Sequence, residues 1–357
     1  MISDSRRARR PLVRSSAVLI AALAAIAVAV TGCSGSSGKD ASRATTGSSS
    51  GSDATSAGSS STAASPSAAS SSAATSAAAA PVHIKLLNSD GAVYGVGMPV
   101  VAYFSAKLAS GVAFAKATTF TVNGQPITGH WYFENSAAID GYPIEGHYRP
   151  DPAAGSALPY WPAHATVHMD MKTQGVSAGD GMAFDDSLTL DFTTGDQIIS
   201  YVDGASKRMT VSVNGTNVAT YEVSLGKSST PTFNGTKVVM QLGEDTPGTD
   251  TLRPSGAVRM KGQGYDEIVN WSVRITQSGE YVHAAPWNSR IGQASTSAGC
   301  TNLTTSDAQN FYTTYAHVGD VLIYTNTGGS TMPSWDGFGD WNLSAAVWNA
   351  GGVVSMS

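Results

Sequence analysis

The chain has 357 residues and a formal net charge of −5 at neutral pH. Outside its first residues it has no cluster of lysine and arginine, which argues against nucleic acid as a partner. The part that follows a low-complexity N-terminal segment has about 275 residues, enough for two domains.

Residues 1–33 have the three parts of an export signal. Arginines in residues 6–14 form a basic region, and residues 16–30 form an apolar run that is shorter than the roughly 20 residues a spanning helix needs. The run ends in Val-Thr-Gly-Cys, which resembles a bacterial lipobox with Cys33 as the lipid-accepting residue. The alternatives are a plain signal peptide and an uncleaved anchor with an incidental cysteine. The lipobox predicts a lipid anchor in the outer face of the cell membrane.

Residues 34–80 are almost wholly Ser, Ala, Gly and Thr. Such a segment cannot bury enough apolar surface to offset the entropy of ordering it, so we expect a disordered linker in an extracytoplasmic compartment. With Cys33 lipidated, Cys300 has no partner in the chain. A lone thiol in an oxidising compartment is a candidate reactive group, although a small buried apolar residue is the alternative.

Residues 81–196 contain short alternating runs between turn signals. Val167, Met169 and Met171 alternate with polar residues, and residues 188–192 repeat the pattern. Asn123-Gly124 is a signal for a tight hairpin. The pattern predicts an antiparallel sandwich of immunoglobulin type.

Aromatic residues in this first domain cluster at 131–133, 148–150 and 160–162. Packing in the core or against the next domain is the favoured interpretation, and a ligand surface is the alternative. The histidines of this part lack metal-ligand spacing, so we expect surface or packing residues; they are His83, His130, His147, His164 and His168.

A second β-rich domain is predicted at residues 197–327. Residues 209–213 and 216–223 flank Asn214-Gly215 and predict a hairpin, and further strands are expected at 236–242, 268–276 and 279–283. Thr304 and Asp307 resemble a helix cap, after which apolar residues share one helical face. Residues 318–320 should end this helix, and 321–324 should return as a strand. The fold class is therefore mostly β, a sandwich followed by a β-rich domain with one helix after the cysteine.

The residues that carry chemistry are His283 and Cys300. His283 ends a predicted strand seventeen positions before Cys300. A thiol is a poor nucleophile at neutral pH, and a hydrogen-bonded imidazole supplies the missing activation. The small-residue turn before Cys300 can direct the backbone amides of Ala298, Gly299 and Cys300 at one point, where they would stabilise an oxyanion.

This segment resembles the active site of the L,D-transpeptidases, bacterial cell-wall enzymes with a YkuD-type catalytic domain. The matching residues are His283, Ser297, Gly299, Cys300 and Asn302. Further similarity at residues 225–236, 264–265, 281–287, 319–321 and 337–342 extends the resemblance over most of 197–351. Residues 328–357 are similar to the C-terminal extension of actinobacterial multidomain members, so we expect them to pack on the catalytic domain. The sandwich likewise resembles the immunoglobulin-like domain that precedes the catalytic domain in those members.

The resemblance implies acyl transfer on peptidoglycan stem peptides. Cys300 would form a thioester with His283 as general base, and a neighbouring stem would resolve it to a 3→3 cross-link. The Ala284 carbonyl would orient the imidazole, Tyr265 and Trp287 would line the substrate pocket, and Ser297 and Asn302 would complete it. The resemblance requires no metal or cofactor, and it implies acylation of Cys300 by carbapenem-type inhibitors and a position facing the cell wall.

One departure from the family pattern is Ala298, where the family has a histidine. The backbone amide remains, so activity is expected, and the alternative is a catalytically weakened wall-binding lipoprotein. Two other enzyme classes fit less well. An NlpC/P60 peptidase places its cysteine before its histidine, and a sortase needs an arginine shortly after the cysteine.

Overall fold

The computed structural model describes residues 78–152, 158–243, 256–262 and 265–356, and residues from Ala78 onward form one compact unit. The predicted signal, Cys33 and nearly all of the predicted linker lie outside the described residues. Within the described part of the chain, no helix has both the length and the apolar character needed to cross a membrane. The described chain is mostly β, as predicted.

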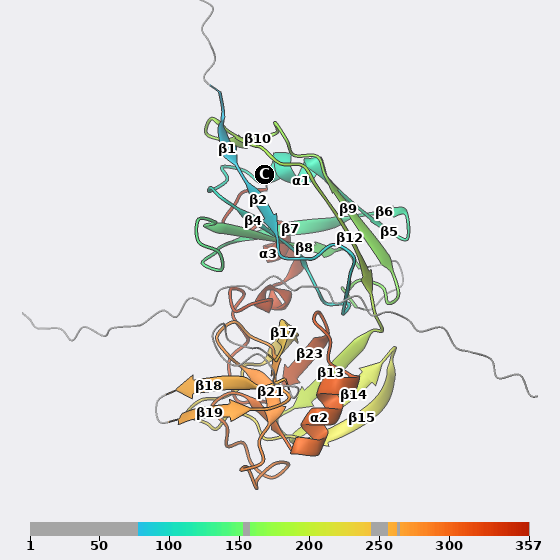
Figure 1. Ribbon diagram of the computed structural model, residues 1–357, viewed down its shortest axis with the longest axis vertical. Helices are drawn as coiled ribbons and strands as arrows, with labels where there is room; N and C mark the ends of the chain where they lie inside the picture. The colour runs from blue at the N-terminus through green and yellow to red at the C-terminus, as the bar shows by residue number, and fades with distance from the viewer. Residues whose placement is uncertain (1–77, 153–157, 244–255, 263–264, 357) are drawn as a thin grey trace, which may run out of the picture. The chain divides into compact units, whose positions relative to one another are not determined.

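The first domain is a two-sheet sandwich, drawn in blue to green in Figure 1. One sheet has the order β2-β4-β8-β7, with β2 at Ile84–Leu86, β4 at Val100–Phe104, β8 at Ile144–Pro150 and β7 at Gly129–Asn135. The other has the order β3-β12-β9-β5-β6, with β3 at Ala92–Tyr94, β12 at Leu188–Thr194, β9 at Thr166–Met171, β5 at Thr118–Val122 and β6 at Gln125–Ile127. A small sheet contains β1 (Ala80–Val82), β11 (Met182–Phe184) and β10 (Ser177–Gly179), and a short helix, α1 (Val112–Ala117), was not predicted.

The alternating pattern of the sandwich is confirmed. Val167, Met169 and Met171 are all fully buried on β9, because successive side chains of a strand point to opposite faces. The hairpin signal is also confirmed: Asn123 and Gly124 join β5 to β6 with positive φ angles of 51° and 75°. Two consecutive residues in that region make the turn that matches the twist of paired strands.

The aromatic segments form core rather than a ligand surface. Trp131, Tyr148 and Trp161 are buried, and Tyr148 stacks on Phe120 with ring centroids 3.7 Å apart. Tyr160 packs edge-on against Trp341 of the C-terminal extension at 4.9 Å. The favoured interpretation of these aromatic residues is thus confirmed.

The second domain, drawn in yellow to red in Figure 1, contains two sheets and a separate hairpin. The larger sheet has the order β15-β14-β13-β23-β16, with β15 at Thr216–Glu222, β14 at Arg208–Val213, β13 at Ile198–Asp203, β23 at Val321–Thr325 and β16 at Gly235–Val238. The smaller has the order β17-β20-β21-β22, with β17 at Gln241–Leu242, β20 at Val273–Arg274, β21 at Tyr281–Ala284 and β22 at Thr301–Leu303. The hairpin pairs β18 (Val258–Gly262) with β19 (Tyr265–Val269).

Two strand predictions in this domain are wrong as single strands. Residues 236–242 divide between β16 and β17, which belong to different sheets. Residues 268–276 divide between β19 and β20, because the chain turns at Trp271 with a φ of 55°. The hairpin of β14 and β15 and the returning strand β23 are where the sequence predicts them.

The helix after the cysteine is α2, Thr305–Thr314. The Thr304 side chain accepts a hydrogen bond from the Asp307 amide, so the predicted cap is confirmed. Ala308 and Phe311 bury one face of α2 against β21 and β22. The helix therefore packs on the two strands that carry the candidate site.

The C-terminal extension contacts both domains, which goes beyond the predicted packing on the second alone. The Asn342 side chain, in the short helix η1 (Gly339–Asn342), exchanges hydrogen bonds of 2.7 and 2.9 Å with the Thr236 backbone of β16. In α3 (Ala345–Asn349), Trp348 stacks on Tyr132 of β7 with ring centroids 5.1 Å apart. The domain boundaries themselves stay predictions.

Candidate active site

Parallel pairing of β21 with β22 brings His283 and Cys300 to the same edge of the smaller sheet. His283 on β21 is paired with Asn302 on β22, and Cys300 lies immediately before β22. The neighbours Val282 and Ala284 and the facing Leu303 are buried in the apolar cluster of the second domain. Burial of these side chains fixes the register of the two strands, and with it the position of both reactive groups.

The His283 imidazole is held at both nitrogens. Nδ1 donates to the Ala284 carbonyl at 2.8 Å, the orienting contact that the sequence predicted, and Nε2 accepts from the Asn302 side-chain amide at 3.0 Å. Asn302 is held in turn by Asn288, whose amide donates to its Oδ1 at 3.0 Å. These contacts specify a neutral imidazole with a lone pair on Nε2. Burial lowers the pKa of His283, which favours the same neutral form.

The Cys300 thiol has partners other than His283 in this structure. Its Sγ donates weakly to the Gly279 carbonyl at 3.8 Å. Burial raises the pKa of the thiol to about 11, although a backbone hydrogen bond from Tyr281 and the positive charge of Lys237 oppose that rise. The resting site therefore pairs a neutral thiol with a neutral imidazole, and the imidazole must remove the proton during reaction.

The turn before Cys300 is anchored by Ser297. Its backbone exchanges hydrogen bonds of 3.0 Å with Leu225 and Lys227, and its hydroxyl donates to the Cys300 carbonyl at 2.6 Å. The same hydroxyl accepts from the Gly299 amide at 3.1 Å, so this predicted oxyanion donor is already engaged. Among the described residues, the amides of Ala298 and Cys300 have no acceptor and remain available as donors.

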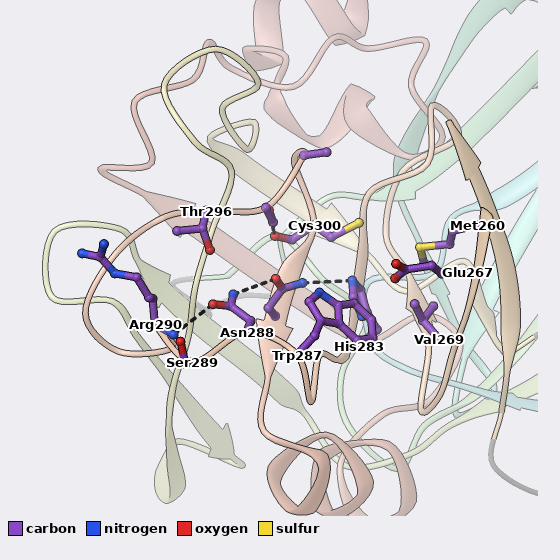
Figure 2. A pocket seen from close by; sticks show the side chains of 13 residues that line it. Met260, Glu267, Val269, His283, Trp287, Asn288, Ser289, Arg290, Thr296 and Cys300 are labelled. Carbon is purple, nitrogen blue, oxygen red and sulfur yellow. Dashed lines mark hydrogen bonds between the residues drawn. The ribbon is translucent and has the colours of Figure 1, made fainter. Parts of the chain in front are cut away.

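A pocket of about 480 Å³ opens over the two reactive groups (Figure 2). The predicted residues that line it are His283, Trp287, Ser297, Ala298, Cys300 and Asn302. Trp287 is 55% exposed and its ring centroid lies 6.2 Å from that of His283, so it forms a wall beside the imidazole. Tyr265 begins β19, but its side chain lies outside the described residues.

Sequence reasoning missed several charged groups near the site. Figure 2 shows Glu267 and Met260 on one side of Cys300 and Arg290 on the other, so the pocket has a negative and a positive end. Lys237 and Glu280 form an ion pair inside the domain that acts electrostatically on Cys300. No local pattern marks these residues, since they come from segments that only the fold brings together.

The predicted packing role of the sandwich histidines holds for His147, which is buried and lies 3.1 Å from Asp340. His83, Asp185 and Asp186 have donor atoms within 4.8 Å of one another, a spacing that could hold a metal ion. The His83 Nδ1 already lies 2.6 Å from an Asp185 oxygen in an ion pair. This group belongs to the sandwich and does not line the pocket.

Comparisons with known proteins agree with this site. Residues 197–323 match the family model of the L,D-transpeptidase catalytic domain (YkuD), and residues 34–177 match that of a bacterial Ig domain. The chain is 34% identical over 283 residues to L,D-transpeptidase 2 of Mycobacterium tuberculosis, covering 76% of this chain and 64% of that protein. It is 31% identical over 235 residues to L,D-transpeptidase 1 of the same species, covering 66% of this chain and 81% of the relative.

Among solved structures, the LD transpeptidase LdtMt1 in complex with imipenem superposes with a TM-score of 0.51 at 27% identity, covering 68% of this chain and 97% of that one. The β-rich fold and the site together define a two-domain protein with a YkuD-type domain. The chain belongs to the L,D-transpeptidase family. It spans less than two thirds of two of its relatives, 64% of L,D-transpeptidase 2 and 57% of L,D-transpeptidase 5.

Proposed function

We propose that this protein is a peptidoglycan L,D-transpeptidase in which Cys300 is the nucleophile and His283 the general base. The observation that carries the proposal is the neutral His283, whose Nε2 lone pair is presented to the pocket that also contains Cys300. The arrangement suits acyl transfer, because a base and a nucleophile line one pocket with free amides nearby. Its substrate would be the stem peptide of peptidoglycan, as for the family.

The first half-reaction is proton transfer and thioester formation. The thiol turns from the Gly279 carbonyl toward Nε2 of His283, which takes the proton as sulfur attacks the carbonyl of the third stem residue. The oxyanion is stabilised by the amides of Ala298 and Cys300, and that of Gly299 joins them once it leaves the Ser297 hydroxyl. Collapse of the tetrahedral adduct breaks the bond to D-alanine, whose amine takes the proton back from His283.

The second half-reaction restores the enzyme. A side-chain amine of a neighbouring stem loses a proton to His283 and attacks the thioester. The Cys300 thiolate leaves, recovers the proton from the imidazolium, and a 3→3 cross-link results. The negative Glu267 on one side of Cys300 and the positive Arg290 on the other suit a substrate that carries both an amine and a carboxylate.

We further propose that a carbapenem acylates Cys300 and that the protein acts outside the cytoplasm. LdtMt1 has been solved with imipenem, and the thiol here lines a comparable open pocket. Cleavage before Cys33 and its lipidation would anchor the chain to the outer face of the membrane, and residues 34–80 would span the gap to the cell wall. Loss of membrane association in a Cys33→Ser variant tests the anchor.

The test of the proposed function is cross-linking of disaccharide-tetrapeptides by the purified folded protein. Cys300→Ser should reduce the yield of 3→3 dimers to background, because a serine hydroxyl has no thiolate character at neutral pH. Unchanged circular dichroism controls for folding. A folded wild-type protein that yields no dimers and no thioester would instead favour the wall-binding alternative raised by Ala298.

A further inference from the structure

A fully buried lysine lies beside the Gly299–Cys300 turn. Lys237 on β16 has a relative exposure of 0% and forms an ion pair with Glu280, which is 7% exposed and directly precedes β21. Replacing such a pair by apolar side chains of similar volume is often neutral or stabilising. Stability alone is therefore a weak reason for two buried charges at this place.

The Glu280 side of the pair surrounds the sulfur. The carbonyl of Gly279 accepts from Sγ at 3.8 Å, and the backbone of Tyr281 also hydrogen-bonds the sulfur. Glu280 itself accepts from the Phe233 amide at 2.8 Å. A Cβ on Gly299 would lie only 3.7 Å from a Glu280 oxygen, so this carboxylate lies against the turn.

The Lys237 side of the pair reaches the residue after the nucleophile. Its Nζ lies 3.8 Å from the ring centroid of Tyr324, a cation–π contact. The Tyr324 hydroxyl is hydrogen-bonded to the Thr301 hydroxyl at 2.8 Å. The ion pair is thus in contact with the backbone before the sulfur and linked to the residue that follows it.

The charges that act on the thiol come from this pair. Residues 297–300 carry no charge before the cysteine, and His283 is held neutral. Lys237 favours the Cys300 thiolate and Glu280 opposes it. Asp336, fully buried, is also negative toward both members of the pair and is itself bonded to the Ser278 amide and hydroxyl.

We propose that Lys237 and Glu280 are positioning residues of the nucleophile: the Lys237 ammonium stabilises the Cys300 thiolate as it forms, and Glu280 holds that ammonium beside the turn. This inference rests on the proposed function, in which Cys300 is the nucleophile. It assigns a buried source of positive charge to a turn whose own side chains supply none.

The test measures the alkylation rate of Cys300 by iodoacetamide from pH 7 to 10, which requires no substrate. Glu280→Gln removes the carboxylate and keeps an acceptor for the Phe233 amide, so alkylation at pH 8 should rise about tenfold. Adding Lys237→Met should reverse that gain and bring the rate to within about twofold of wild type. An exposed pair in the sandwich, Lys172 and Asp170 at 2.8 Å, provides the matched control, Lys172→Met/Asp170→Asn, which should change nothing.

Equal alkylation rates in the single and double variants would overturn the role of the lysine charge. If Glu280→Gln does not fold, the double variant, which leaves no unpaired charge, is compared with wild type in turnover. A fall in kcat of about tenfold with KM within about twofold supports positioning of the nucleophile, and an unchanged kcat refutes it. Absence of cross-links in the wild type would refute the proposed function instead, and the alkylation result would stand apart from it.

Discussion

Replacing Gly299 with alanine tests whether the turn before Cys300 requires its backbone conformation. Gly299 has a φ of 129°, a region that side-chain-bearing residues rarely occupy. An added Cβ would lie 3.7 and 3.8 Å from its nearest neighbours, both atoms of Glu280, so it meets no clash. The penalty is therefore backbone strain alone, on the order of 1–3 kcal/mol of unfolding free energy.

The effect on turnover should exceed the effect on stability. The chain relieves the strain by rotating the Gly299 peptide, which moves the Cys300 sulfur and the amides beside it. A displacement of about 1 Å at reacting atoms can lower the rate roughly a hundredfold. We therefore expect Gly299→Ala to unfold at a lower urea concentration and to turn over disaccharide-tetrapeptide about a hundredfold more slowly.

The matched control is Gly215→Ala in the hairpin between β14 and β15. Gly215 has a φ of 82° and nothing within 4 Å of its would-be Cβ, so it carries the same kind of strain away from the pocket. This variant should lose comparable stability and keep wild-type turnover. Equal turnover of Gly299→Ala and Gly215→Ala, with equal stability, would refute the reasoning about the turn.

The remaining predictions concern three residues of the site. Asn302→Asp replaces the donor to His283 Nε2 with an acceptor, which puts a proton on that nitrogen; turnover at pH 7 should fall roughly a hundredfold, and wild-type turnover would contradict the assigned base. Burial lowers the pKa of His283, so only the unfolded chain takes up its proton below about pH 6.5; urea unfolding should show stability falling as pH drops from 7 to 5, and less steeply in His283→Gln. Identical slopes would show that His283 is not held neutral. Ala298→His should turn over tetrapeptide at a rate equal to or above that of the natural protein, and a loss below one tenth would show that the turn has no room for a side chain.

Local patterns in the sequence were enough to locate the centre of the site. His283, Ala284 and Trp287 are contiguous with a strand, and Cys300 and Asn302 follow a turn and open the next one. Because a single parallel pairing joins those two strands, a motif that is local in sequence stays local in space. The helix cap at Thr304 was predictable for the same reason.

The parts that were not predicted depend on contacts between distant segments. Lys237 lies 43 residues before Glu280, and nothing in the sequence marks a lysine on a strand as buried with a partner. The break of residues 268–276 at Trp271 requires a positive φ in a residue that rarely adopts one, so a continuous strand was the natural expectation. The contacts of α3 with β7 likewise depend on how the extension crosses to the sandwich.

The central claim is that Cys300 becomes acylated during the reaction. The most direct measurement is intact-protein mass spectrometry after acid quenching of a reaction with disaccharide-tetrapeptide and no acceptor. The account predicts a mass gain equal to the donor minus D-alanine, mapped to Cys300 by digestion, absent in Cys300→Ser and reversed by adding an acceptor stem. A folded wild-type protein that forms cross-links with no adduct on Cys300, or with an adduct on another residue, would contradict the account.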